Sequence, residues 1–259
     1  MSREIRAGLV QIDEYGPWTV SPEPRRETDL QSLQASLFAD FAAFIGERDG
    51  YAFYGRFDNM YAVANEATPD DFRRFQRRVR TRYPVTVSVG LGAASTPAAA
   101  LGVASERLQA AGGAQDGGRS EAMAVGDAPE SGDTGSVTVA HFDVVDVTGE
   151  HTDRRNAVDV TLSIRRATLA LATHLRSEHG GLAHFVGGDN VIAVCPDLDP
   201  AAYETAVDHV ATETGIELQV GIGRGATAHA AGDAAKHALE RCRETGTRIH
   251  GADRVPADH

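Results

Sequence analysis

One short pattern occurs twice in this chain of 259 residues and constrains its fold more than any other feature. In each copy an apolar or aromatic run leads into a turn that contains Asp-Asn, and a second apolar run follows. The turns contain Asp58-Asn59 and Asp189-Asn190. Asp and Asn tolerate the left-handed backbone of tight turns, so each copy is typical of a β-hairpin with an acid at its tip. The two aspartates are 131 residues apart (58 to 189), and this repeat predicts two related domains.

The segments around the two hairpins follow one another in the same order. In the first half, periodicity and helix-start signals predict a strand at 4–13, a helix at 28–50, the hairpin at 51–64, a helix at 68–82, a strand at 85–91 and a helix at 96–112. The second half predicts a strand at 136–143, a helix at 158–178, the hairpin at 182–195, a helix at 200–214, a strand at 216–222 and a helix at 228–244. The order strand, helix, strand, strand, helix, strand is the split βαβ, or ferredoxin-like, arrangement. We therefore predict an α+β fold made by tandem duplication, with domains at 1–112 and 136–259 and a Gly-rich linker at 113–135.

In a ferredoxin-like domain the end of the first strand and the tip of the hairpin meet at one edge of the sheet. This topology brings Asp13 near Asp58, and Asp143 near Asp189. Asp13 and Asp143 are 130 residues apart, close to the spacing of the hairpins, so we expect two equivalent pairs. Neighbouring carboxylates repel one another unless one is protonated or a cation lies between them, and a shared Mg²⁺ is the economical solution. A single aspartate at a hairpin tip is usually only a turn residue, but four acids in register at strand ends favour metal sites.

The segment at 14–27 contains three prolines, the only tryptophan (Trp18) and the pair Arg25-Arg26. The prolines predict a stiff, extended loop, which is suited to hold a nucleotide by stacking on its base and by bidentate contacts to phosphate. The alternative is a surface loop in which Trp18 packs on the core and the arginines are solvated, and composition alone favours that alternative. In the second hairpin Gly187 and Gly188 would let a phosphate approach the backbone closely.

Composition excludes several classes of protein. A net charge of −12 disfavours a nucleic-acid-binding surface. We find no apolar run of membrane-spanning length and no signal peptide, so we expect a cytoplasmic protein. The two cysteines, Cys195 and Cys242, form no Cys-x-x-Cys motif and exclude a Cys-rich zinc site. The acid excess and the single lysine, Lys236, indicate either a high-salt cytoplasm or a GC-rich genome, and nothing in the sequence separates these two readings.

Three segments closely resemble the motifs of the archaeal GTP cyclohydrolase III family: YGPWTVSPEPRRETDL at 15–30, RFDN at 56–59 and FVGGDN at 185–190. A fourth, GAQD at 113–116, is also similar to a family segment. The resemblance covers nearly the whole chain, and the acidic composition fits a haloarchaeal member. It implies tandem palm-like domains related to those of nucleotidyl cyclases and polymerases, commonly assembled as homo-oligomers.

The resemblance also implies an activity. Members of this family use Mg²⁺ to open the imidazole ring of GTP, with release of the two outer phosphates. The product is 2-amino-5-formylamino-6-(5-phosphoribosylamino)pyrimidin-4(3H)-one, a precursor of riboflavin and the deazaflavin cofactor. The absence of a zinc cluster and the paired carboxylates fit Mg²⁺ bound to a triphosphate.

The residues that we expect to carry this chemistry fall into three overlapping groups. The expected metal ligands are Asp13, Asp58, Asp143 and Asp189; the expected catalytic residues are Asp13, Asp58, Asn59 and Asp189; and the expected substrate-binding residues are Tyr15, Trp18, Arg25, Arg26, Gly187, Gly188 and Asn190. Asp13 and Asp58 would hold Mg²⁺ on the triphosphate, while the arginines neutralise phosphate charge. The second half offers either a second working site or a wall of the first, and which half opens the ring is left undecided.

Two rival functions are considered, one close in chemistry and one from another class. A nucleotidyl or diguanylate cyclase would act on the same substrate, but Asn190 stands where the diguanylate family has an acid. A non-catalytic GTP sensor would keep the fold without turnover, but the presence of acids at all four positions argues against such decay.

Overall fold

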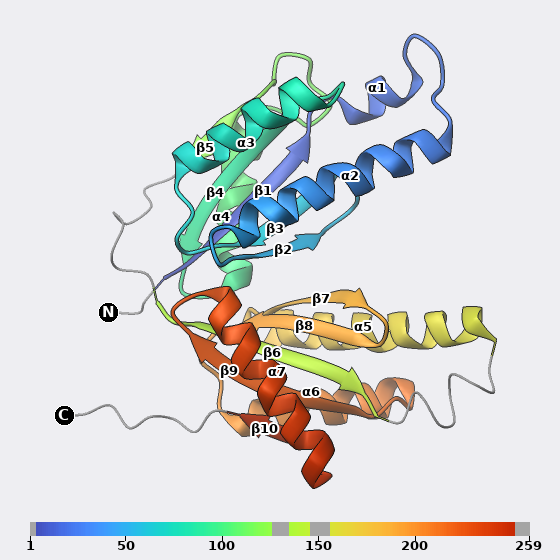
Figure 1. The fold of residues 1–259 in the computed structure, drawn as a ribbon, viewed down its shortest axis with the longest axis vertical. Coiled ribbons are helices and arrows are strands. Elements are labelled where there is room, and N and C mark those ends of the chain that lie inside the picture. Colours follow the sequence, from blue (N-terminus) through green and yellow to red (C-terminus); the bar gives the residue numbers. More distant parts are fainter. Residues whose placement is uncertain (1–3, 126–134, 146–155, 252–259) are drawn as a thin grey trace. The chain divides into compact units, whose positions relative to one another are not determined.

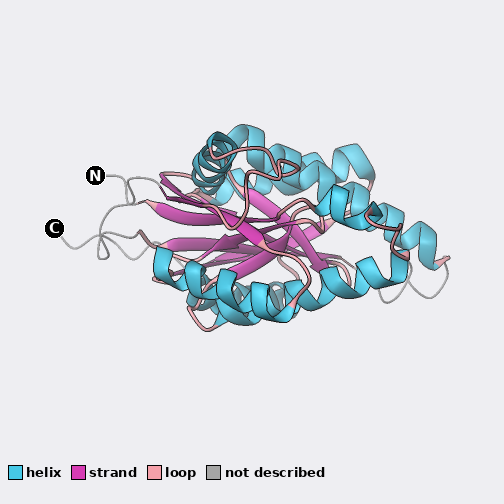
Figure 2. Cartoon of the chain, turned by 90° about the horizontal axis from the view of Figure 1, so that it is seen from above, coloured by secondary structure: helices cyan, strands magenta, loops and turns pink. Residues whose placement is uncertain are grey.

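The structure is a computed structural model that describes residues 4–125, 135–145 and 156–251. The chain forms two compact units, Met1–Gly135 and Ser136–His259, which are described separately (Figure 1). Both are α+β units with one five-stranded sheet each, and helices flank the strands (Figure 2).

The first unit contains a sheet of strand order β2-β3-β1-β4-β5. Its elements are β1 (Ile5–Ile12), α1 (Tyr15–Val20), α2 (Glu27–Gly46), β2 (Tyr51–Tyr54), β3 (Asn59–Val63), α3 (Pro69–Arg82), β4 (Val87–Ala94), α4 (Pro97–Ala110) and β5 (Met123–Val125). Strand β1 is central and antiparallel to both β3 and β4. Apolar residues of α2 and α3 form the larger core on one face of the sheet, and α4 packs on the other face.

The second unit repeats this arrangement with strand order β10-β9-β6-β8-β7. Its elements are β6 (Val137–Val144), α5 (Ala157–His179), β7 (Leu182–Gly187), β8 (Asn190–Cys195), α6 (Pro200–Thr214), β9 (Leu218–Gly225), α7 (Ala228–Thr245) and β10 (Ile249–Gly251). Helices α5 and α6 supply the main core, and α7 covers the opposite face. The predicted tandem of ferredoxin-like domains is confirmed.

The helix boundaries follow from capping residues in the sequence. Thr68 and Asp71 form a capping box at the start of α3, with Pro69 at the first helical position. Asp199 and Thr227 cap α6 and α7 through their side chains. These side chains satisfy backbone N–H groups that would otherwise have no partner, which explains why the predicted helix starts agree closely with the structure.

Helix α7 packs closely against β9. A Cβ atom placed on Gly221 would lie 2.2 Å from the carbonyl oxygen of Ala235, so only glycine fits there. Gly223 is equally close to the carbonyl oxygen of Ala231. These glycines therefore serve the contact between helix and sheet, which sets α7 near the end of β6.

Two segments differ from expectation. The segment at 14–27, predicted to be an extended loop, begins with helix α1, and Pro17 lies within the first turn, where a proline is tolerated. The predicted linker is in part ordered structure of the first unit: β5 pairs in parallel with β4, and the side chain of Arg119 is buried. Residues 126–134 lie outside the described part of the chain.

Membrane insertion through a helix finds no support in the described ranges. None of the helices there combines the length and the apolar character needed to cross a bilayer.

Candidate active site

The strand register places Gln11, rather than Asp13, in the position that Asp143 occupies in the second unit. Gln11 lies opposite Asn59 of β3 and opposite Ser88 of β4. Asp143 lies opposite Gln219 of β9. The register of β6 and β8, extended by one pair beyond Phe142 and Val191, sets Asn190 beside Asp143.

Backbone hydrogen bonds at the strand ends give the same correspondence. The N–H of Asp13 donates to the carbonyl of Thr86 at 3.0 Å, and the N–H of Val145 donates to that of Glu217 at 2.9 Å. The counterpart of Asp13 is therefore Val145, and the expected equivalence of Asp13 and Asp143 is wrong. A shift of two residues keeps every side chain on the same face of a strand, so hydrophobic alternation does not reveal it.

Asp13 is fully engaged in the interior of the first unit. Its carboxylate accepts hydrogen bonds from Ser88 Oγ at 2.5 Å, Thr86 Oγ1 at 2.8 Å and the N–H of Glu121 at 2.9 Å. Arg119, with a side chain only 2% exposed, lies 3.7 Å from the same carboxylate. The Arg119 guanidinium also donates to Gln11 Oε1 at 3.0 Å. The buried guanidinium of Arg119 thus already offsets the negative charge of the Asp13 carboxylate.

Asp58 has different partners at the tip of the first hairpin. It accepts a hydrogen bond from Asn59 Nδ2 at 2.9 Å and forms an ion pair with Arg56 at 3.4 Å. Among the described residues, Asp13 and Asp58 share no partner. The N–H of Ile12, next to Asp13 in the chain, donates to the backbone carbonyl of Asp58 at 3.0 Å, so the two residues lie at adjoining ends of β1 and the hairpin. Their role as a metal-binding pair stays a prediction.

The second unit does bring its two acids together. Burial of Asp189, the charge of Asp143 and a hydrogen bond between the two side chains raise the pKa of the Asp189 carboxyl group. Asp143 is 5% exposed and accepts hydrogen bonds from Gln219 at 3.0 Å and from Arg243 at 2.6 Å. The two side chains therefore lie close enough to influence each other, and their role as metal ligands stays a prediction.

A chain of hydrogen bonds holds Asp189 in place. His141 Nε2 lies 2.9 Å from Asn190 Oδ1, and Asn190 Nδ2 donates to Asp189 Oδ1 at 3.1 Å. Burial lowers the pKa of His141, which favours the neutral imidazole. The charges of Lys236 and Arg243 on α7 act on His141 in the same direction. In the first unit Leu9 takes the place of His141 opposite the corresponding glycine, Gly90 for Gly221, so the chain is particular to the second unit.

The turn of the second hairpin has a backbone that the first cannot adopt. Gly187 has φ +122° and Gly188 has φ +62°, whereas Arg56 and Phe57 stand at the corresponding positions, 131 residues earlier. A Cβ atom on Gly187 would meet nothing within 4 Å. The glycines therefore allow the positive φ angles of this turn, and they leave space open beside Asp189.

Changing Gly187 to alanine is expected to destabilise the second unit by about 1–3 kcal/mol, because its φ is unfavourable for any residue with a Cβ atom. We also expect a higher KM for GTP, since the turn positions Asp189. Gly188→Asn is the matched control, because Asn tolerates the left-handed region. Urea unfolding and steady-state kinetics measure both effects, and equal stability of Gly187→Ala and wild type would contradict this account of the turn.

The other expected substrate-binding residues lie in α1 or in the segment that follows it in the first unit. Tyr15 stacks on Trp18 with ring centroids 6.1 Å apart, and its hydroxyl accepts a hydrogen bond from Gln34 at 2.6 Å. Arg25 lies over the Trp18 ring at 3.9 Å and donates to backbone carbonyls of the same segment. Arg26 forms a bidentate pair with Asp29, a residue of α2. In the structure the two arginines thus hold the segment rather than present free guanidinium groups.

The donor set of the second unit fits Mg²⁺. The described residues contain no cluster of three or more metal-ligating side chains. Mg²⁺ characteristically binds through one or two carboxylates together with substrate phosphates and water, so a pair such as Asp143 and Asp189 is sufficient. The raised pKa of Asp189 means that a cation between the carboxylates would relieve their repulsion.

Several residues of these sites carried no signal in the sequence. Arg119 lies in a Gly-rich segment that suggested a linker. Gln11 is an uncharged residue, so a search for paired acids does not identify it. Arg243 lies 100 residues from Asp143, and only the packing of α7 against β6 brings them together.

Comparison with known proteins identifies a family that matches this chain. Residues 7–258 match the profile of GTP cyclohydrolase III. The chain is 55% identical to a GTP cyclohydrolase III of Halobacterium salinarum, covering 93% of this chain and 96% of the relative. It is 54% identical to that of Halorubrum lacusprofundi, covering 93% of each chain, and 52% identical to that of Natronomonas pharaonis, covering 94% and 97%. Among solved structures, the GGDEF domain of DgcB from Caulobacter crescentus aligns with a TM-score of 0.39 and 15% identity, covering 45% of this chain and 77% of that one.

Proposed function

Since this chain belongs to the GTP cyclohydrolase III family, we propose that it opens the imidazole ring of GTP at a Mg²⁺ site formed by the second unit. The observation that carries this assignment is the pair Asp143 and Asp189, whose carboxyl groups interact directly beside an open Gly-Gly turn. The first unit has Gln11 and a buried Arg119 in the corresponding region. The reaction consumes one water to open the ring and two more to hydrolyse the phosphoanhydride bonds, giving the formylaminopyrimidine monophosphate and two phosphates.

The residues around the pair have separate tasks in this proposal. Asp143 and Asp189 would hold Mg²⁺, which when bound supplies positive charge to the triphosphate oxygens and makes a bound water more acidic. Asn190, fixed by His141, orients the Asp189 carboxylate. Arg243 limits the negative charge of Asp143. Lys236, an exposed residue on α7, adds positive charge for the phosphates.

Incubation with GTP tests the function directly. With Mg²⁺ we expect loss of the purine ultraviolet spectrum together with release of two phosphates per GTP, and a chelator should stop both. An intact purine in a cyclised product would favour the cyclase, and bound but unchanged GTP would favour the sensor.

Metal binding has a readout that does not depend on turnover. We expect Mg²⁺ to raise the melting temperature of the wild type, because the ion stabilises the folded state that holds both acids. The Asp189→Asn variant should lose this increase, and its melting temperature without metal should not fall, because the substitution removes a repelled charge. An equal Mg²⁺ effect in wild type and variant would argue against the site.

The homo-oligomer and the place in riboflavin and deazaflavin synthesis stay predictions.

A further inference from the structure

Helix α3 concentrates positive charge in a strongly acidic chain. Its 14 residues contain six of the 25 basic residues of the chain: Arg73, Arg74, Arg77, Arg78, Arg80 and Arg82. Six arginines and two aspartates give the helix a formal charge of +4, so the net charge of −12 leaves −16 on the rest of the chain. A cluster of one sign produces a local field that attracts groups of the opposite sign.

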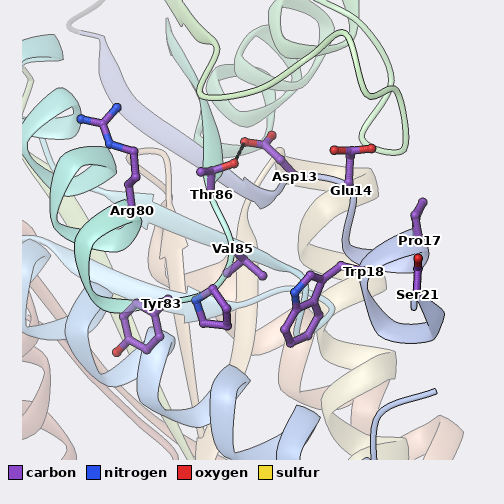
Figure 3. Close-up of a pocket in the computed structure, with 10 residues that line it drawn as sticks. Asp13, Glu14, Pro17, Trp18, Ser21, Arg80, Tyr83, Val85 and Thr86 are labelled. Carbon is purple, nitrogen blue, oxygen red and sulfur yellow. Dashed lines mark hydrogen bonds between the residues drawn. The ribbon is translucent and has the colours of Figure 1, made fainter. Parts of the chain in front are cut away.

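The six arginines lie on the solvent side of the helix. All are exposed, whereas the apolar side chains of the same helix are buried: Phe72, Phe75 and Val79. Arg78, which has an acid partner, still has 45% of its side chain exposed, and Arg74 has 60%. At the end of the helix the Arg80 guanidinium points away from the Tyr83 ring (Figure 3). We call these six residues the α3 arginine surface.

Nearby acids are too few to neutralise the α3 arginine surface. Two of them are each shared by two guanidinium groups: Asp40 accepts hydrogen bonds from Arg78 at 3.1 Å and Arg82 at 2.8 Å, and Asp71 accepts from Arg48 at 2.9 Å and from Arg74. A guanidinium has five N–H donors, so a shared carboxylate leaves unused donors on both arginines. The surface therefore keeps excess charge and hydrogen-bonding capacity.

Arg77 lies at the centre of this surface. Its exposed side chain forms no ion pair with a residue that the structure describes. Its neighbours one turn away, Arg73 and Arg80, are paired with Asp70 at 2.6 Å and with Glu121 at 2.9 Å. Exposed ion pairs contribute about 0–1 kcal/mol, so an incoming carboxylate can replace Asp70 at small cost. The row Arg73, Arg77 and Arg80 is thus the part of the surface most open to a ligand.

We infer that the α3 arginine surface docks a short segment of a partner protein that contains several consecutive acidic residues. Planar guanidinium groups bind carboxylates in bidentate pairs. A helix rises about 1.5 Å per residue, so Arg73 to Arg82 span roughly 14 Å, which about four residues of extended peptide cover. This chain has no run of three consecutive acids, so a second copy does not offer such a segment.

Nucleic acid fits the surface less well than an acidic peptide does. Its phosphates continue along the whole strand, so a bound strand would extend past the helix onto a chain that otherwise carries −16. Non-specific binding of single strands also uses aromatic side chains on which the bases stack. The aromatic residues of α3, Phe72 and Phe75, are buried. A short acidic segment meets neither difficulty.

A fluorescein-labelled decamer of L-glutamate is the probe, and its fluorescence anisotropy is followed as protein is added. Far-ultraviolet circular dichroism first identifies the lowest salt concentration at which the protein is folded, and the titration begins there. We expect saturable binding that weakens as salt is raised, because salt screens exposed charges. The double variant with Arg73→Glu and Arg77→Glu should bind at least about tenfold more weakly, since like charges oppose one another across an interface.

The matched control combines Arg165→Glu and Arg166→Glu on α5, because it makes the same change in charge at two exposed positions of the other unit. It should bind the probe as wild type does. Arg77→Glu alone breaks no ion pair among the described residues, so it should fold, turn over GTP as wild type does and still bind the probe more weakly. No saturable binding, equal losses in both double variants, tighter binding of a ten-nucleotide uridine strand, or self-association of wild type that Arg77→Glu abolishes would each overturn the inference.

Discussion

Replacing Asp189 by asparagine is expected to lower kcat for GTP ring opening by about 10²–10³-fold, the scale on which loss of an electrostatic stabiliser acts. The substitution keeps the size of the side chain and its contact with Asn190 but removes one of the two charges that would hold Mg²⁺. Asp143→Asn should have a similar effect, and the double variant should be little worse than either alone, because the two residues act as a unit. Loss of the purine spectrum measures all three.

The first hairpin supplies the matched control. Asp58→Asn makes the same chemical change at the corresponding position of the other unit, where the recorded partners of the Asp58 side chain are Asn59 and Arg56. We expect turnover within about twofold of wild type, as for a substitution that shifts free energy by about 0.5 kcal/mol. A large loss of turnover in Asp58→Asn together with an active Asp189→Asn would place the reaction in the first unit and reject this assignment.

Replacing Asp13 by alanine is expected to destabilise the first unit by about 3–5 kcal/mol, because it removes the buried carboxylate that lies 3.7 Å from the Arg119 guanidinium. Burial already lowers the pKa of Arg119, and the charges of Asp13 and Asp116 counteract this effect. The substitution also removes the acceptor for Ser88, Thr86 and the N–H of Glu121. Trp18 lies in the same unit, so urea unfolding followed by its fluorescence reports on the affected part of the chain.

A second substitution distinguishes a buried ion pair from a general packing defect. Arg119→Met in the Asp13→Ala background should restore part of the lost stability, because it removes the uncompensated charge. Asp58→Asn should unfold as wild type does. If Asp13→Ala is as stable as wild type, the carboxylate is not the counter-ion that the structure indicates.

Most of the fold could be predicted from the sequence because local signals agreed with it. The helix starts at Thr68 and Asp199 have side-chain caps, and the alternation of apolar residues in 137–144 fits a central strand. Helix α1 could not be predicted from the sequence, because the three prolines at 14–27 suggested an extended loop. The buried part of 113–125 was missed because its ordering depends on Arg119 and on pairing with β4, neither of which is a local property.

The candidate site could be predicted only in part. The repeat of Asp-Asn turns identified Asp58 and Asp189 as counterparts, and the Gly-Gly pair marked the hairpin with the unusual backbone. Sequence spacing then aligned Asp13 with Asp143, although the sheet aligns Gln11 with Asp143. Both alignments put the same residues on the same face, so only the register of hydrogen bonds distinguishes them.

The most direct test is binding of Mn²⁺, as a paramagnetic substitute for Mg²⁺, followed by electron paramagnetic resonance in the presence of GTP. The account predicts that Asp58→Asn binds the ion with wild-type affinity and that Asp143→Asn and Asp189→Asn lose it. Retention of Mn²⁺ by both second-unit variants, with loss in Asp58→Asn, would contradict it.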